Sequence, residues 1–287
     1  MKPNFLFIGP DKTGSKWLHE ILLRHPDSYV PVIADPYFFD RYYARGIEWY
    51  TSLFRAAPAR AVAVGELSHD YIFSAVAADR IARDLPGVRL LTCLREPVER
   101  SFSQYLSMVR AGMTREPFER AIDTIPALIE NSQYATHLET YFARFPRNQV
   151  KVLFYDRLVA APRAFAAEVF EFLGLRFVDE LRYDQPVNPA GRPRIYHFAR
   201  LVHRVAWLMR DVGFARLVGA VKRSFIRSLV YRPYRREERP AIALATRRAL
   251  LERFEPELKR LERMLGVQLD PWRRGENLCK AGVMSIT

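Results

Sequence analysis

Short apolar runs alternate along the chain with longer stretches in which apolar residues recur at helical spacing. Apolar runs of about four to eight residues are typical of buried strands, and a period near 3.6 is typical of amphipathic helices. The predicted strands are Phe5–Ile8, Ala61–Gly65, Arg89–Leu94 and Val150–Tyr155. The predicted helices are Lys16–Arg24, Ile47–Arg55, Tyr71–Asp84, Val98–Gly112, Ala135–Phe145 and Pro162–Leu173. This alternation predicts an α/β fold with a central parallel β-sheet flanked by helices.

The pattern changes beyond Gln185. Residues 186–194 are rich in proline and arginine, which predicts a basic loop with turns. Residues 196–232 combine apolar residues at helical spacing with interleaved arginines, and a final amphipathic helix is predicted over 241–265. We therefore expect residues 1–195 to form a core, 196–240 a basic helical cap or insertion, and 241–287 a helix and tail that complete the same domain.

The turn after the first predicted strand carries a candidate anion site. Its sequence is Gly9-Pro10-Asp11-Lys12-Thr13-Gly14-Ser15-Lys16-Trp17, and a helical pattern follows. A strand, a glycine-rich turn and a helix in this order present backbone N–H groups and a helix N-terminus to a phosphate. The common nucleoside-triphosphate loop places lysine directly after the second glycine and a hydroxyl residue next. Here Ser15 precedes Lys16, so the order is reversed.

A second candidate anion site follows the strand Arg89–Leu94. Arg95 directly follows this strand, Pro97 comes two positions later, and Ser103 lies on the helix beyond. Arginine presents a two-pronged donor to a phosphate, and a hydroxyl on a helix can complete the contact. Ligands of parallel α/β sheets bind at the carboxyl ends of the strands, where both motifs fall.

These two segments resemble the sulfotransferases that use 3′-phosphoadenosine-5′-phosphosulfate (PAPS), and their motifs are closest to those of bacterial and glycosaminoglycan or carbohydrate members. The stretch from Lys12 to Trp17 matches the family's 5′-phosphosulfate loop, and Arg95, Pro97 and Ser103 match its 3′-phosphate motif. The resemblance covers roughly residues 3 to 195. It implies the P-loop NTPase-like sulfotransferase fold, here with a C-terminal helical extension.

The resemblance also implies roles for individual residues. Lys12 would contact the bridging oxygen of the transferring sulfuryl group, and Trp17 would stack on adenine. The residues that would hold the 5′-phosphate are Thr13, Gly14, Ser15 and Lys16. Those that would bind the 3′-phosphate are Arg95 and Ser103, joined by Arg192 or Arg194 from a late basic loop. PAPS would be the donor and adenosine 3′,5′-bisphosphate (PAP) the product. No metal is expected, because Lys12, the loop amides and Arg95 supply positive charge.

The general base has two main candidates. Glycosaminoglycan sulfotransferases carry a motif that consists of a catalytic glutamate, any residue, a histidine, two phenylalanines and an aspartate. Residues 35–40 of this chain resemble that motif, with Asp35 in the place of the glutamate and Tyr37 in the place of the histidine. His69 follows the second predicted strand, titrates near neutral pH, and resembles the histidine base of small-molecule members. Glu66 is a weaker third candidate. Leu67 replaces a lysine that the glycosaminoglycan enzymes carry, which removes one cation from the acceptor side.

The net charge of the chain indicates which classes of molecule it can bind. The formal net charge is +13, which attracts polyanions. No helix-turn-helix, zinc-finger or aromatic RNA-binding signature accompanies it, so we do not expect nucleic acid. The basic segment 196–232 is either a cap packed on the core, with arginine stems covering apolar surface, or a contact for an anionic acceptor or an anionic membrane. The oligomeric state is left open.

No signal-like segment begins the chain, and no apolar run reaches bilayer length. We therefore expect a cytoplasmic protein, with peripheral contact at the inner membrane face as an option. The favoured function is transfer of a sulfuryl group from PAPS to a hydroxyl of a saccharide, glycolipid or other metabolite. The alternatives are an ATP/Mg-dependent P-loop kinase-like phosphotransferase and a basic membrane- or nucleic-acid-associated nucleotide-binding module. The position of Lys16 argues against the first, and Lys12 with Arg95 against the second.

Overall fold

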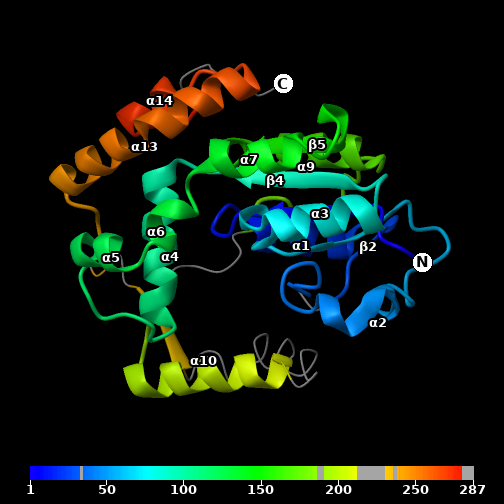
Figure 1. Ribbon diagram of the computed structural model, residues 1–287, viewed down its shortest axis with the longest axis horizontal. Coiled ribbons are helices and arrows are strands. Elements are labelled where there is room, and N and C mark those ends of the chain that lie inside the picture. Colours follow the sequence, from blue (N-terminus) through cyan, green and yellow to red (C-terminus); the bar gives the residue numbers. More distant parts are fainter. Residues whose placement is uncertain (33–34, 186–190, 212–229, 235–237, 239, 280–287) are drawn as a thin grey trace. The chain divides into compact units, whose positions relative to one another are not determined.

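The computed structural model describes residues 1–32, 35–185, 191–211, 230–234, 238 and 240–279 (Figure 1). Its main sheet has five parallel strands in the order β2-β3-β1-β4-β5. They are β1 (Phe5–Gly9), β2 (Ser28–Tyr29), β3 (Ala63–Leu67), β4 (Arg89–Leu94) and β5 (Val150–Phe154). The parallel sheet confirms the predicted fold class. Of these five strands, β2, which pairs Ser28 with Ala63, was not predicted.

Helices flank the strands. Every residue of β1 and β3 is buried, as expected for parallel strands covered on both faces. The helices that belong with the sheet are α1 (Ser15–Arg24), α2 (Gly46–Ser52), α3 (Ala75–Asp84), α7 (Tyr134–Phe142), α8 (Tyr155–Ala160), α9 (Pro162–Leu173) and α14 (Asp270–Arg274). The predicted helix over 71–84 is divided, because the Ser74 hydroxyl accepts from the Ala77 N–H and starts α3 only at Ala75.

The chain forms two compact units. The sheet unit comprises residues 1–96, 133–185 and 254–287, and the helical unit comprises 97–132 and 186–253. The helical unit contains α4 (Pro97–Arg110), α5 (Phe118–Thr124), α6 (Ala127–Glu130), α10 (Tyr196–Asp211) and the antiparallel pair β6 (Gly191–Pro193) and β7 (Tyr231–Pro233). The predicted domain boundaries at residues 195 and 240 stay a prediction.

The region beyond residue 190 differs in part from the prediction. Residues 196–211 are helical as expected, and 212–229 lie outside the described residues. Tyr231 and Arg232, which fall within the span predicted as helical, instead belong to a strand, Tyr231–Pro233, that pairs with Gly191–Pro193. The partner segment lies about forty residues away in sequence, and local periodicity carries no information on such a pairing.

The predicted C-terminal helix is α13 (Leu244–Leu265). In the sheet unit α14 lies beside the last turns of α13 (Figure 1), and the Arg273 guanidinium binds Glu255 and Glu262 there. The presence of α13 confirms the predicted C-terminal helical extension. No helix in the described part of the chain combines the length and the apolar composition that crossing a bilayer requires.

Candidate active site

The glycine-rich loop joins β1 to α1 as predicted, and both of its glycines have positive φ. A Cβ atom at Gly9, where φ is 112°, would lie 2.1 Å from the carbonyl oxygen of His69. A Cβ atom at Gly14, where φ is 95°, would lie 2.5 Å from Leu158 Cδ2. Gly9 therefore requires glycine both for its backbone conformation and for the close approach of the His69 backbone, whereas Gly14 requires it for its positive φ, since the Leu158 methyl can move.

Two side chains of the loop are engaged within the sheet unit. The buried Thr13 hydroxyl donates to the Pro10 carbonyl at 2.7 Å. The buried Trp17 indole N–H donates to the Tyr183 carbonyl at 3.0 Å, and its ring meets Phe165 edge-on. Lys16 is exposed, and Ser15 is partly buried. The proposed contacts of all four residues with a nucleotide stay predictions.

The N-terminus of α1 is suited to an anion. Gly14 occupies the N-cap position without a side-chain cap, and the first turn of α1 contains no acidic residue. The first N–H groups of a helix have no partner within the helix and carry partial positive charge. Lys12, whose φ is 69°, precedes this end of the helix by three positions.

Arg95 lies at the same edge of the sheet as this loop. Its Nη1 donates to the Lys12 carbonyl at 3.3 Å, and its guanidinium lies over the Tyr155 ring, 4.8 Å from the centroid. The Tyr134 hydroxyl donates to the Arg95 carbonyl at 2.7 Å and so fixes the backbone there. The structure thus brings together Lys12 and Arg95, one residue from each motif.

The remaining candidates for the 3′-phosphate belong to the helical unit. Ser103 is partly buried on α4, Arg192 lies in β6, and Arg194 follows β6 with an exposed side chain. Their roles stay predictions.

The two rival bases form one pair. His69 Nδ1 lies 2.6 Å from Asp35 Oδ1, and His69 Nε2 lies 3.0 Å from the Tyr37 hydroxyl. Each of the two side chains is about one quarter exposed, Asp35 at 24% and His69 at 25%, so the pair is open to an incoming molecule. Asp35 and Tyr37 have positive φ, 60° and 53°, and together with Lys12 they are the non-glycine residues described with this conformation. Such strained residues cluster at functional sites.

Charge state follows from this pairing. Burial lowers the pKa of the His69 imidazole, but the charge and hydrogen bond of Asp35, together with Asp70 and Asp11, outweigh burial and raise this pKa to about 9. At neutral pH His69 is therefore an imidazolium, with its two ring nitrogens donating to Asp35 and Tyr37. The pair is a carboxylate held by a cation.

Glu66 holds the segments that carry Tyr37 and His69 in place through buried hydrogen bonds. Its carboxyl, 1% exposed, accepts hydrogen bonds from the hydroxyls of Tyr71 at 2.8 Å and Tyr50 at 3.3 Å. It also accepts from Ser68 Oγ at 2.8 Å, and that oxygen accepts the Tyr37 N–H at 3.1 Å. Burial raises the Glu66 pKa to about 8, against the hydrogen bonds of Ser68 and Tyr71.

Sequence reasoning treated Glu66 only as a weak base candidate and missed its anchoring contacts. The available signal was an acidic residue directly after a predicted buried strand, because a buried carboxyl requires hydrogen-bond partners.

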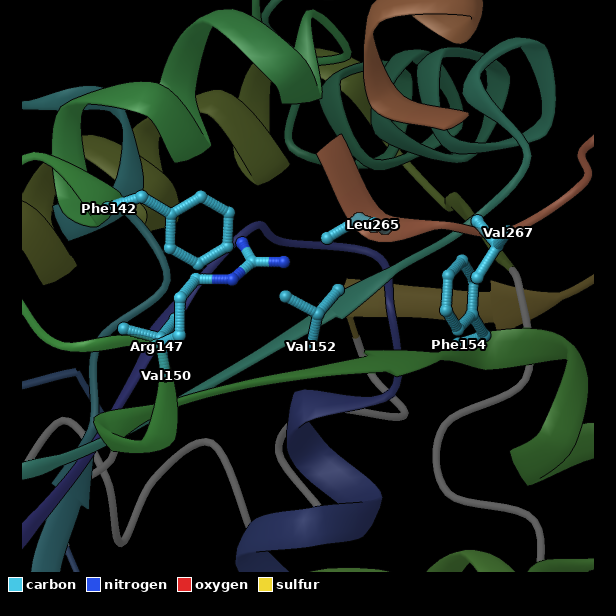
Figure 2. Close-up of a pocket in the computed structure, with 7 residues that line it drawn as sticks. All are labelled: Phe142, Arg147, Val150, Val152, Phe154, Leu265 and Val267. Carbon is cyan, nitrogen blue, oxygen red and sulfur yellow. The ribbon is translucent and has the colours of Figure 1, made fainter. Parts of the chain in front are cut away.

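A separate pocket lies at the edge strand β5. Figure 2 shows it lined by side chains of β5, of the end of α7 and the segment that follows it, and of the end of α13 and the segment that follows it: Phe142, Arg147, Val150, Val152, Phe154, Leu265 and Val267. The Arg147 guanidinium lies over the Phe142 ring and donates to the Met264 carbonyl. None of the predicted nucleotide-binding or catalytic residues lines this pocket.

Comparison with known proteins identifies the family. The family model for the sulfotransferase domain matches residues 2–186. Heparan sulfate glucosamine 3-O-sulfotransferase 3B1 from Mus musculus is 32% identical over 183 residues, which are 61% of this chain and 46% of that protein. Heparan sulfate glucosamine 3-O-sulfotransferase 6 from Homo sapiens is 30% identical over 184 residues, 61% of this chain and 53% of that protein. The chain thus spans about half the length of these relatives.

A solved structure shares the fold. The sulfotransferase from Alicyclobacillus acidocaldarius superposes with a TM-score of 0.71 at 22% identity, covering 96% of this chain and 100% of that one. The match of the family model to most of the sheet unit and to α4 confirms the resemblance seen in the two phosphate motifs. This chain belongs to the sulfotransferase family.

Proposed function

We propose that this protein transfers a sulfuryl group from PAPS to a hydroxyl of a saccharide. The observation that carries the proposal is the meeting of a glycine-rich loop, an arginine and a carboxylate–imidazolium pair at one edge of the sheet. Lys12 and Arg95 are joined through the Lys12 carbonyl, and Gly9 touches the backbone of His69. Family membership supplies the reaction class.

The nucleotide would bind between the loop and Arg95. The amides at the start of α1 suit the 5′-phosphate, because neither a capping side chain nor an acidic residue competes with an anion there. The Arg95 guanidinium can bind the 3′-phosphate with two parallel hydrogen bonds. Lys12 would place its ammonium at the oxygen that bridges phosphorus and sulfur.

Asp35 is the proposed general base. The acceptor hydroxyl gives its proton to the Asp35 carboxylate as its oxygen forms the new bond to sulfur. The bond from sulfur to the bridging oxygen breaks, and Lys12 stabilises the negative charge that this oxygen gains. His69 is protonated at neutral pH, so its role is to hold and orient Asp35 rather than to remove the proton itself.

A saccharide is the proposed acceptor class. The relatives described above are named for sulfation of heparan sulfate glucosamine. Leu67 stands where glycosaminoglycan enzymes carry a lysine. Since that cation is absent, we expect a less highly charged saccharide to be accepted here than a fully sulfated chain.

Calorimetric titration tests the donor site. We expect PAP to bind more tightly than ATP with Mg²⁺. Arg95→Ala should weaken PAP by about tenfold to a hundredfold and AMP, which lacks the 3′-phosphate, far less. Arg176→Ala, which removes an exposed arginine paired with Asp27, is the matched control. Preference for ATP with Mg²⁺ would instead support a kinase-like phosphotransferase.

A transfer assay tests the acceptor. Radiolabelled PAPS is incubated with desulfated heparan chains, neutral oligosaccharides and simple phenols, and the labelled product is separated. Label in a saccharide supports the proposal. Label found only in the phenols would support PAPS as the donor but would contradict a saccharide as the acceptor.

A further inference from the structure

Helix α10 carries an exposed apolar stripe. Phe198, Leu201, Val205 and Leu208 are 47%, 57%, 44% and 63% exposed. The spacing of these positions places all four on one side of a helix. Contiguous exposed apolar side chains on a folded protein mark a binding surface. We call this set the α10 stripe.

The other side of α10 is held within the helical unit. Ala199 and Arg210 are buried. Near the start of the helix, the Arg115 guanidinium lies 3.8 Å from the centroid of the Tyr196 ring and hydrogen-bonds His197. The helix (yellow in Figure 1) is therefore fixed to its unit along one side, while the side chains of the stripe are exposed.

Cations accompany the stripe. Arg200 and Arg204 are exposed and lie one helical turn apart. Residues 194–210 contain four arginines and no acidic residue. An apolar face joined to a cationic one, at low mean hydropathy, is the composition of helices that lie in the plane of a membrane surface.

We propose that α10 binds the surface of a membrane rich in anionic phospholipids. The α10 stripe enters the boundary between headgroups and acyl chains, and Arg200 and Arg204 bind lipid phosphates. A second copy of this chain fits the surface less well, because two such faces would bring arginines of like charge together. A soluble acidic glycan would bind the arginines and leave the stripe in water.

Vesicle co-sedimentation of the full chain tests this. We expect binding to vesicles of phosphatidylcholine mixed with phosphatidylglycerol, and little binding to phosphatidylcholine alone. Arg200→Gln with Arg204→Gln should weaken binding by about 25-fold, since each arginine near an anionic leaflet contributes about fivefold. Added salt should weaken wild-type binding in the same direction.

Leu201→Glu with Leu208→Glu should abolish vesicle binding. Leu244→Glu, which changes a leucine 75% exposed outside α10, is the matched control and should leave it intact. Circular dichroism and PAP titration check that each variant is folded. Absence of binding by the wild type, or binding that survives the double glutamate change, would overturn the proposal. Self-association lost in that variant without any vesicle binding would assign the stripe to a second copy instead.

Discussion

The buried carboxyl of Glu66 makes stability depend on pH in a way that one substitution can isolate. Its pKa is raised from the ordinary value of 4.5 to about 8, because burial disfavours the charged form. A carboxyl whose pKa is higher in the folded state contributes stability below pH 4.5 and loses it as the pH rises through 8. Glu66→Gln keeps the shape and removes the titration.

The expected size follows from the shift. Between about pH 5 and pH 8, Glu66 should lower the free energy of unfolding of the wild type by about 3 kcal/mol relative to Glu66→Gln. For a chain of this size that corresponds to about 5 °C in Tm. His69, whose raised pKa also removes stability as the pH rises toward 9, is present in both proteins and cancels in the difference.

Tm and urea midpoints of both proteins, measured from about pH 5 to pH 8 at constant ionic strength, test this. Glu171→Gln on α9, where the carboxyl is exposed, controls for the loss of one acidic group. We expect the curves of wild type and Glu66→Gln to diverge steadily as the pH rises, with the variant gaining. Parallel curves would refute the reasoning, since they would mean that Glu66 takes up no proton on folding.

Three further changes probe the site. Gly14→Ala puts a Cβ on a backbone with a φ of 95°, so we expect a loss of about 1–3 kcal/mol in urea unfolding and weaker PAP binding; normal stability would contradict the strain at this position. Lys12→Ala should lower kcat about 100-fold with little change in the Kd of PAP. Equal losses in both would mean that Lys12 only anchors the nucleotide. Asp35→Asn should lower kcat about 100-fold or more and, by removing the charge that holds the imidazolium, lower the His69 pKa from about 9 in an NMR titration. An unchanged titration would contradict the ion pair.

The strands that carry the phosphate motifs could be predicted because each is an apolar run long enough to stand out. β1, β4 and β5 differ from their predictions by at most one residue at either end. β2 could not be predicted, because two residues form no pattern and Ser28–Tyr29 is a strand only through its pairing with β3. The same limit explains β7, whose partner lies on the far side of α10 in sequence.

In the candidate site too, some features could be predicted from the sequence and others could not. The loop around Lys12 and the position of Arg95 follow from local spacing, and the structure brings them to one edge. The link between Asp35 and His69 does not follow, since 34 positions separate them and only the fold makes them a pair. From the sequence, Asp35 and His69 were therefore alternative candidates for the base. In the structure they form an ion pair, in which the His69 imidazolium binds the Asp35 carboxylate.

The contact between Gly9 and the carbonyl of His69 has a consequence for how such an enzyme can diversify. Because the donor loop and the histidine that holds Asp35 touch through backbone, at a distance where no side-chain carbon fits, neither can shift without the other. The loop proposed to bind the donor and the histidine proposed to hold the base therefore form one block in which a change in one affects the other. We expect new acceptors to be gained through segments outside this block, and changes within the helical unit must spare Ser103, Arg192 and Arg194, which are predicted to bind the 3′-phosphate.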